Sequence, residues 1–190
     1  ISSEHKILSN SELIRKKFLN LLNSEKLDFN LLTDELYKNT WVYAFQSKRR
    51  WPNLYHIKVK EHQPVAKWGD ENYLTHSGIL INPLIDNSYV DLVILKGKES
   101  EKFLLLDISR QVQNQLNRYN ESIKEVNLSS GGVLLISTEQ GAELVFTKKN
   151  FREQLERLED LISFELFSGK LNNIRNMDFR YKNGVSILFR

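Results

Sequence analysis

The segment that most constrains the fold spans residues 49–68, because it alternates in polarity and contains two prolines. The chain alternates from Leu54 to His62, so that Tyr55, Ile57 and Val59 point one way and His56, Lys58, Lys60 and His62 point the other. A period of two is typical of a half-buried β-strand. Pro52 disfavours helix at the preceding residue and marks a turn before this strand. Pro64 cannot donate to a sheet ladder, so the strand is expected to end or kink there.

Composition narrows the class of protein. The chain has 190 residues, of which 41% are hydrophobic and 27% charged, enough for one domain or two small ones with real cores. A net charge of +3 is too small to indicate a nucleic-acid partner by itself. The chain has no cysteine, which excludes disulfides and thiolate metal sites. No apolar run approaches the ~20 residues of a membrane helix, and no signal peptide opens the chain.

Residues 1–63 carry the pattern of helices packed on a small sheet. A strand remnant is expected at residues 1–4 and strands at 41–51 and from Leu54 onward. Between them, Ser9 and Glu12 fit a capping box before a helix, and residues 27–38 predict a second helix. The predicted order is strand, helix, helix, strand, strand.

After Pro64 the pattern changes to short strands and turns. Strands are expected at residues 65–68, 73–74 and 79–81, strands or buried segments at 91–95 and 102–106, and a hairpin at 132–147. Apolar residues from Val112 to Val126 at spacings of four and three predict a helix over Ser109 to Asn127, and Asn150 is expected to cap a last helix. The sequence therefore predicts an α+β protein. It has one small domain at 1–63 and a mostly antiparallel β-domain with two helices at 64–190.

The chain ends in a predicted hairpin that allows two registers. A two-residue Asn183-Gly184 loop pairs Phe179 with Leu188. A three-residue loop pairs Tyr181 with Val185, Phe179 with Ile187 and Met177 with Phe189. The second register keeps the apolar faces together and places Gly184 where a left-handed residue is wanted, so it is favoured. It also places Tyr181 on the face expected to be core.

The last strand, Val185 to Phe189, is expected to lie at a sheet edge, where unpaired backbone groups can receive a partner strand. The alternative from the residues alone is a hairpin that is paired on both sides within its own domain.

No set of residues indicates catalysis or a cofactor. The four histidines, His5, His56, His62 and His76, are scattered, and His56 and His62 are too far apart along a strand to share a metal. No phosphate-binding glycine loop and no nucleophile elbow occur. The basic cluster at residues 47–50 beside Trp51 is one that a nucleic-acid binder would use, but it also fits a solvated strand edge. Neither an enzyme nor a nucleic-acid protein is expected.

Two segments resemble one family. Residues 50–68 carry Arg-Trp-Pro, then Glu-x-x-Pro-Val-Ala-x-Trp, and residues 177–185 carry Met-Asp-Phe-Arg-Tyr-Lys-Asn-Gly-Val. Together they are similar to the periplasmic part of the bacterial cell-division protein family FtsQ/DivIB. The resemblance implies a POTRA domain (β-α-α-β-β) followed by a β-domain.

The resemblance also implies a function. The family is non-enzymatic, binds the small membrane proteins FtsB and FtsL, contacts other divisome proteins through the POTRA domain, and helps assemble septal cell-wall synthesis. It implies an upstream helix that anchors the protein once in the inner membrane, with this region in the periplasm at the septum. The alternative is a POTRA-type chaperone or translocation module that binds extended polypeptide strands.

Within the family, the partner docks on the last strands of the β-domain. Carried over by matching residues, the implied partner-binding set is Arg180, Tyr181, Asn183, Gly184, Val185, Ser186, Ile187 and Phe189. Arg180 is expected to pair with a partner carboxylate, and Tyr181 and Phe189 to be aromatic anchors. One departure is that residues 129–131, Ser-Ser-Gly, stand where some members have a basic residue.

Overall fold

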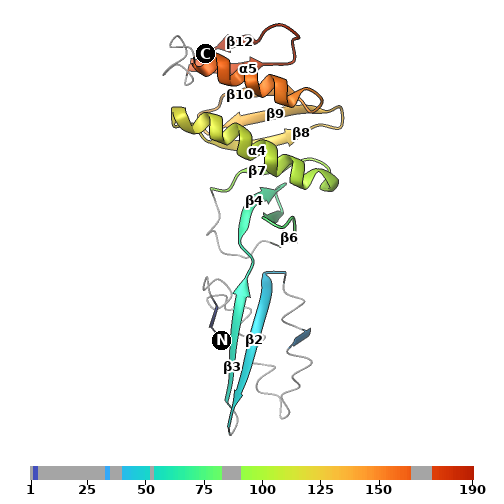
Figure 1. The fold of residues 1–190 in the computed structure, drawn as a ribbon, viewed down its shortest axis with the longest axis vertical. Coiled ribbons are helices and arrows are strands. Elements are labelled where there is room, and N and C mark those ends of the chain that lie inside the picture. Colours follow the sequence, from blue (N-terminus) through green and yellow to red (C-terminus); the bar gives the residue numbers. More distant parts are fainter. Residues whose placement is uncertain (1, 4–32, 35–39, 52–53, 83–90, 164–172) are drawn as a thin grey trace. The chain divides into compact units, whose positions relative to one another are not determined.

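The computed structural model describes residues 2–3, 33–34, 40–51, 54–82, 91–163 and 173–190. The chain divides into two compact units, one formed by Ile1–Pro64 with Asn72–Tyr89 and the other by Val65–Glu71 with Val90–Arg190 (Figure 1). The two helices predicted between Ser9 and Lys38, which belong to the POTRA order, fall almost wholly outside the described residues. Within the described ranges, no helix has the length and apolar character needed to cross a membrane.

The first unit contains a three-stranded sheet in the order β1-β3-β2. Strand β2 (Val42–Arg50) pairs antiparallel with β3 (Leu54–Glu61), and β1 (Ser2–Ser3) pairs parallel with β3. The predicted alternation is confirmed, because Ile57 and Val59 are buried while Lys58 between them is exposed. Pro64 begins β4 (Pro64–Trp68), a position at which a strand tolerates the missing N–H.

Trp41 ties residues 72–82 to the first unit. Its side chain is 2% exposed, and its ring meets Tyr73 edge-on with the centroids 6.0 Å apart. Its indole Nε1 donates to the carbonyl of Asn82 at 2.6 Å. Tyr73 lies on β5 (Asn72–Thr75), which forms a hairpin with β6 (Leu80–Ile81). The hairpin after Pro64 therefore completes the core around Trp41.

The predicted domain limit at residue 63 leads to a direct test. We expect a fragment of residues 1–82 to unfold at a higher temperature than one of residues 1–63. The shorter fragment uncovers Trp41 and removes the acceptor of its N–H, and both changes destabilise. Thermal unfolding followed by circular dichroism measures the difference, with Tyr73→Ala in the longer fragment as the control that removes only the ring contact. Equal melting temperatures for the two fragments would contradict the role given to Trp41.

The second unit is built on a mixed sheet whose strands run in the order β12-β11-β10-β9-β8-β7-β4. Pairs β4–β7, β7–β8 and β10–β11 are parallel, whereas β8–β9, β9–β10 and β11–β12 are antiparallel. The bounds are β7 Ile94–Lys96, β8 Ile123–Leu128, β9 Val133–Thr138, β10 Glu143–Thr147, β11 Ile174–Asp178 and β12 Ser186–Phe189. Parallel neighbours need a crossover, and helices α4 (Lys102–Leu116) and α5 (Phe151–Ser163) lie in two of these connections.

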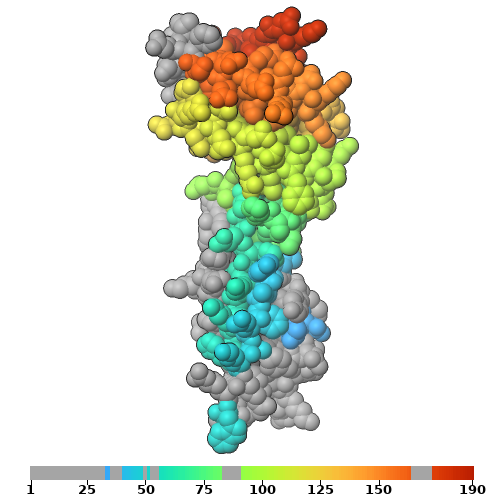
Figure 2. Space-filling view, in the orientation of Figure 1, coloured from blue at the N-terminus to red at the C-terminus, as the bar shows by residue number. Residues whose placement is uncertain are grey.

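Helices α4 and α5 lie side by side over one face of this sheet (Figure 1 and Figure 2). Gln115 of α4 donates from Nε2 to Glu159 of α5 at 3.2 Å, and the Tyr119 hydroxyl donates to the Ile162 carbonyl at 2.6 Å. The apolar stripes of both helices meet alternate residues of the strands. The fully buried members of this core include Leu105, Val112, Leu134, Ile136, Phe146 and Leu158. The predicted α+β class is thus confirmed.

One predicted helix is confirmed only in part, and its bounds are wrong. Residues 102–106, predicted as a strand or a buried segment, begin α4, and the helix predicted to run from Ser109 to Asn127 ends at Leu116. A short 3₁₀ turn follows, Asn120 adopts a left-handed conformation at φ 53°, and β8 begins at Ile123. Ile123 and Val126 are three apart and both buried because the register shifts between Ile123 and Glu125. An irregularity in a strand therefore produced the spacing that indicated a helix.

Candidate functional site

The C-terminal strand β12 occupies one end of the sheet order in the second unit. It pairs with β11 on one side, and no strand among the described residues pairs with it on the other. Leu188 is 54% exposed and Phe189 is 53% exposed. A strand in this position presents backbone donors and acceptors that a further strand can use.

One hydrogen bond shows which backbone N–H groups of β12 point away from β11. The N–H of Arg190 donates to the carbonyl of Asn173 at 2.8 Å, on the β11 side. Residues that exchange bonds with the neighbouring strand alternate with residues that do not. The N–H groups of Phe189 and Ile187 therefore point away from β11, and those of Leu188 and Ser186 point towards it. The Arg190 side chain also donates to the Gln140 carbonyl and secures the end of the strand.

The register of the last hairpin differs from the predicted one. Strand β11 pairs Met177 with Ile187 and Asp178 with Ser186, so residues 179–185 form the connection rather than a three-residue loop. The shift is by two residues, so the apolar faces still coincide. Gly184 is not among the glycines with positive φ, so the predicted left-handed residue at this position is also wrong.

Phe179 explains the longer connection. Instead of pairing with β12, its N–H donates to the carbonyl of Val145 at 2.9 Å and extends the ladder with β10. Its side chain is fully buried and stacks on Phe146, with the ring centroids 4.8 Å apart and the planes 7° apart. The chain leaves the sheet only after this anchor, at Arg180.

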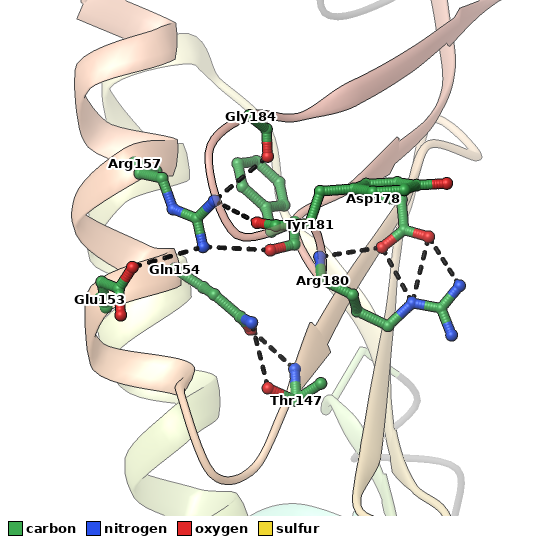
Figure 3. A network of polar contacts seen from close by, with 9 residues as sticks. Thr147, Glu153, Gln154, Arg157, Asp178, Arg180, Tyr181 and Gly184 are labelled. Carbon is green, nitrogen blue, oxygen red and sulfur yellow. Dashed lines mark hydrogen bonds and ion pairs between the residues drawn. The ribbon is translucent and has the colours of Figure 1, made fainter.

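Arg157 on α5 holds the connection from the helix side (Figure 3). Its guanidinium donates to three carbonyls, those of Tyr181 at 2.6 Å, Gly184 at 3.1 Å and Phe179 at 3.2 Å. Glu153, one turn earlier on α5, lies 3.8 Å from the same group. A planar fork with several donors suits this task, since one side chain fixes three points of a loop. Arg157 was not among the residues predicted for the site.

Tyr181 is 58% exposed, because the connection carries it out of the strand and away from the core position that the predicted register gave it. Asn183 and Gly184 are exposed in the same connection, while Val185 and Ile187 are half-buried. Leu188, which was not predicted as a site residue, joins Tyr181 and Phe189 as an exposed apolar group at this end of the sheet.

Arg180 has a partner within the chain. Its Nη2 lies 2.6 Å from Oδ2 of Asp178, its Nε donates to both carboxylate oxygens, and its backbone N–H donates to Oδ1 at 3.0 Å (Figure 3). These bonds lower the pKa of Asp178 and raise the pKa of Arg180. A carboxyl with a depressed pKa stabilises the folded chain above its ordinary pKa and loses this effect as the pH falls. The pair therefore fixes the start of the connection at neutral pH.

The remaining polar residues form no metal site in the part of the chain that the structure describes. No three His, Cys, Asp or Glu side chains there are arranged to hold a metal ion. His56 and His76 are exposed, whereas His62 is half-buried against Tyr43 and burial lowers its pKa. His5 lies outside the described residues. What the second unit does present is an exposed strand edge with apolar side chains beside it.

Comparisons with known proteins agree with this arrangement. The model of the C-terminal region of the cell division protein family FtsQ/DivIB matches residues 66–181, which include both helices and all strands from β7 to β11. The cell division protein FtsQ of Coxiella burnetii is 22% identical over 150 residues, which are 79% of this chain and 61% of that protein. The FtsQ of Aliivibrio fischeri is 24% identical over 84% of this chain and 62% of its own length.

A third relative, the FtsQ of Neisseria meningitidis serogroup B, is 24% identical over 92% of this chain and 76% of its own length. The chain spans about three fifths of the first two relatives. Relatives carrying the same name therefore match both units, and the family model covers more than half of the chain. This chain belongs to the FtsQ/DivIB family of cell division proteins.

Proposed function

We propose that this chain is a non-enzymatic scaffold of the bacterial divisome that binds FtsB and FtsL and helps assemble septal cell-wall synthesis. Family membership supports the role in division. The observation that carries the binding proposal is the exposed outer edge of β12 with apolar side chains beside it. Other divisome proteins are proposed to bind the first unit, as the resemblance to a POTRA domain implies.

The proposed binding mode is strand addition. A partner segment bonds to the outward N–H groups of Ile187 and Phe189, and main-chain bonds of this kind provide affinity with little demand on sequence. The exposed rings of Tyr181 and Phe189, with Leu188, provide apolar anchors, and aromatic anchors dominate the energy of most interfaces. Arg180 is 48% exposed while bound to Asp178, so it presents a cation of fixed position to an acidic partner residue.

A pair of substitutions at residue 187 tests strand addition. Ile187→Pro removes the outward N–H, and an edge strand tolerates proline where its N–H faces solvent. Ile187→Ala removes the same packing but keeps the N–H. We expect the affinity for the periplasmic FtsB segment, measured by calorimetry, to fall at least about tenfold further for the proline variant than for the alanine variant. Equal affinities of two folded variants would exclude a bond at this position.

The side-chain anchors have their own test. Tyr181→Ala is expected to cost about 2 kcal/mol of binding free energy if the ring is a central anchor. Arg180→Glu weakens binding where the partner presents an acidic group. Phe103→Ala is the matched control, because Phe103 is 60% exposed on α4, against 58% for Tyr181. If Tyr181→Ala, Arg180→Glu and truncation after Gly184 leave both fold and affinity unchanged, the site lies elsewhere.

The same edge also suits a competing function. A POTRA-type chaperone or translocation module binds extended polypeptides at a sheet edge without selecting one sequence. An unrelated extended peptide of matched length and charge separates the two proposals. A scaffold specific for FtsB ignores this peptide, whereas a chaperone module binds it with similar affinity.

The proposed location is the inner membrane at the division septum, with one anchoring helix in the full-length protein and these residues in the periplasm. Family membership supports this location. A reporter that is active only in the periplasm, fused after Arg190 of the full-length protein, measures the orientation. An inactive but stable fusion would contradict it.

A further inference from the structure

The first unit carries a charged sheet face to which the proposed scaffold role assigns no residue. On β2 and β3, cross-strand pairing places Gln46 opposite Lys58, Ala44 opposite Lys60, and Lys48 opposite His56. Paired residues of neighbouring strands share a face of the sheet. Lys48, Lys58 and Lys60 are all exposed, so three cations lie in two adjacent rows on one face, here called the lysine face.

The strands that carry these cations offer them no exposed carboxylate. Glu61 is the only carboxylate on β1, β2 or β3, and it is buried at 6% exposure. Within the described residues, the ion pairs involve other side chains and none of these three lysines. In the second unit, by contrast, Lys96, Lys102 and Lys148 are each paired with a carboxylate. Among the residues that the structure describes, the positive charge of the lysine face is therefore not paired with carboxylates.

An exposed tryptophan stands at the end of the same hairpin. Trp51 follows β2 directly in the turn to β3, three residues beyond Lys48, and is 91% exposed. The other tryptophan of the first unit, Trp41, is 2% exposed. An indole ring has an apolar body and one polar N–H, and such rings favour the boundary between membrane and water.

We propose that the lysine face and Trp51 bind the surface of a bilayer that contains anionic phospholipids. Lysines along a strand lie about 7 Å apart on one face and act as flexible point charges, which suits a fluid array of phosphates. A folded acidic partner is more often recognised by the planar fork of arginine in fixed geometry. The ring of Trp51 enters the interface while the lysine stems follow the headgroups.

The expected affinity is modest. Each basic residue close to an anionic membrane contributes about 1 kcal/mol, and the attraction weakens with salt. Contact of this strength binds a free chain weakly and reversibly at low salt, and it orients a chain that is already held at the membrane. The site lies in the first unit and shares no residue with the β12 edge, so each can fail without the other.

The test uses the 190-residue chain and vesicles of phosphatidylcholine with or without phosphatidylglycerol. We expect flotation with the phosphatidylglycerol vesicles only, decreasing as salt is raised. The combined variant Lys48→Glu, Lys58→Glu and Lys60→Glu should lower the partition coefficient at least about tenfold. Trp51→Ala should lower it several-fold. The controls Lys124→Glu and Phe103→Ala alter exposed groups of the same types in the second unit and should leave binding unchanged.

Fluorescence reports on the ring directly. A blue shift of tryptophan emission on adding phosphatidylglycerol vesicles, absent in Trp51→Phe, supports insertion of Trp51. The proposal is overturned if the wild-type chain does not float with anionic vesicles, or if the triple variant floats equally well. Binding of polyglutamate through the same lysines without vesicle binding would overturn it as well and would assign the face to an acidic polypeptide.

Discussion

Replacing Phe179 by alanine is expected to lower the free energy of unfolding by about 3–5 kcal/mol, the range for large aromatic side chains removed from a core. The ring is fully buried and stacked on Phe146, which itself meets Phe151 edge-on at 5.7 Å. Its removal opens a cavity between β10, β11 and α5. Denaturant unfolding followed by circular dichroism measures the loss.

The matched control is Phe189→Ala, which removes the same side chain from an exposed position ten residues later. Phe189 is 53% exposed, so its loss is expected to cost less than about 1 kcal/mol of stability. The two variants should separate stability from binding, because Phe179→Ala is expected to destabilise the fold and Phe189→Ala to lower the affinity for the partner. Similar stability losses for both would show that the Phe146 stack is not the anchor of the connection.

Replacing Arg157 by alanine is expected to lower the free energy of unfolding by about 3 kcal/mol and to weaken FtsB binding in addition. One charged donor satisfies three carbonyls of residues 179–184, and hydrogen bonds to charged groups contribute about 1.5–3 kcal/mol each before the losses overlap. Without the guanidinium, residues 180–185 lose their attachment to α5. The segment that leads into β12 is then no longer held in one position. Stability by denaturant unfolding and affinity by calorimetry measure the two effects.

Two controls define what the guanidinium does. Arg157→Lys keeps the charge but not the fork, and should recover only part of the loss. Gly184→Ala tests the alternative that the glycine shapes the turn. No atom lies within 4 Å of a Cβ built at Gly184, and its φ is not in the left-handed region, so this variant should behave like the wild type. A large destabilisation by Gly184→Ala with none by Arg157→Ala would reverse the assignment.

The features that could be predicted from sequence are those fixed by local pattern. The alternation around Ile57, the hairpin of β9 and β10, and the helix that begins at Phe151 are each encoded within a dozen or so residues. The helix boundary near residue 116 could not be predicted, because a register shift in β8 gave strand residues a helical spacing. The parallel pairing of β10 with β11 depends on a crossover and leaves no local signature.

In the candidate site, too, some features follow from local sequence pattern and others from contacts distant in sequence. An edge position for the last strand was predicted because it is the terminal strand of the sequence, with pairing on both sides as the alternative, and the order of the described strands gives the edge. The hairpin register was not, because Phe179 prefers the ladder with β10 and Arg157 holds the carbonyls that follow. Leu188 was not predicted as a site residue, yet on this edge strand it is exposed next to Phe189. Contacts with residues distant in sequence determine the hairpin register.

The parallel pairing of β10 with β11 has a consequence for how the protein folds. Residues 143–147 and 174–178 meet only after the whole of α5 and its flanking segments have closed between them, whereas β8, β9 and β10 are joined by short local turns. Contacts distant in sequence are slow to form, so the nucleus is expected among β8–β10 and the β11–β12 hairpin joins last. The outer edge of β12, where partner binding is proposed, then forms only on a completed domain. Nascent chains are therefore not expected to associate through it prematurely.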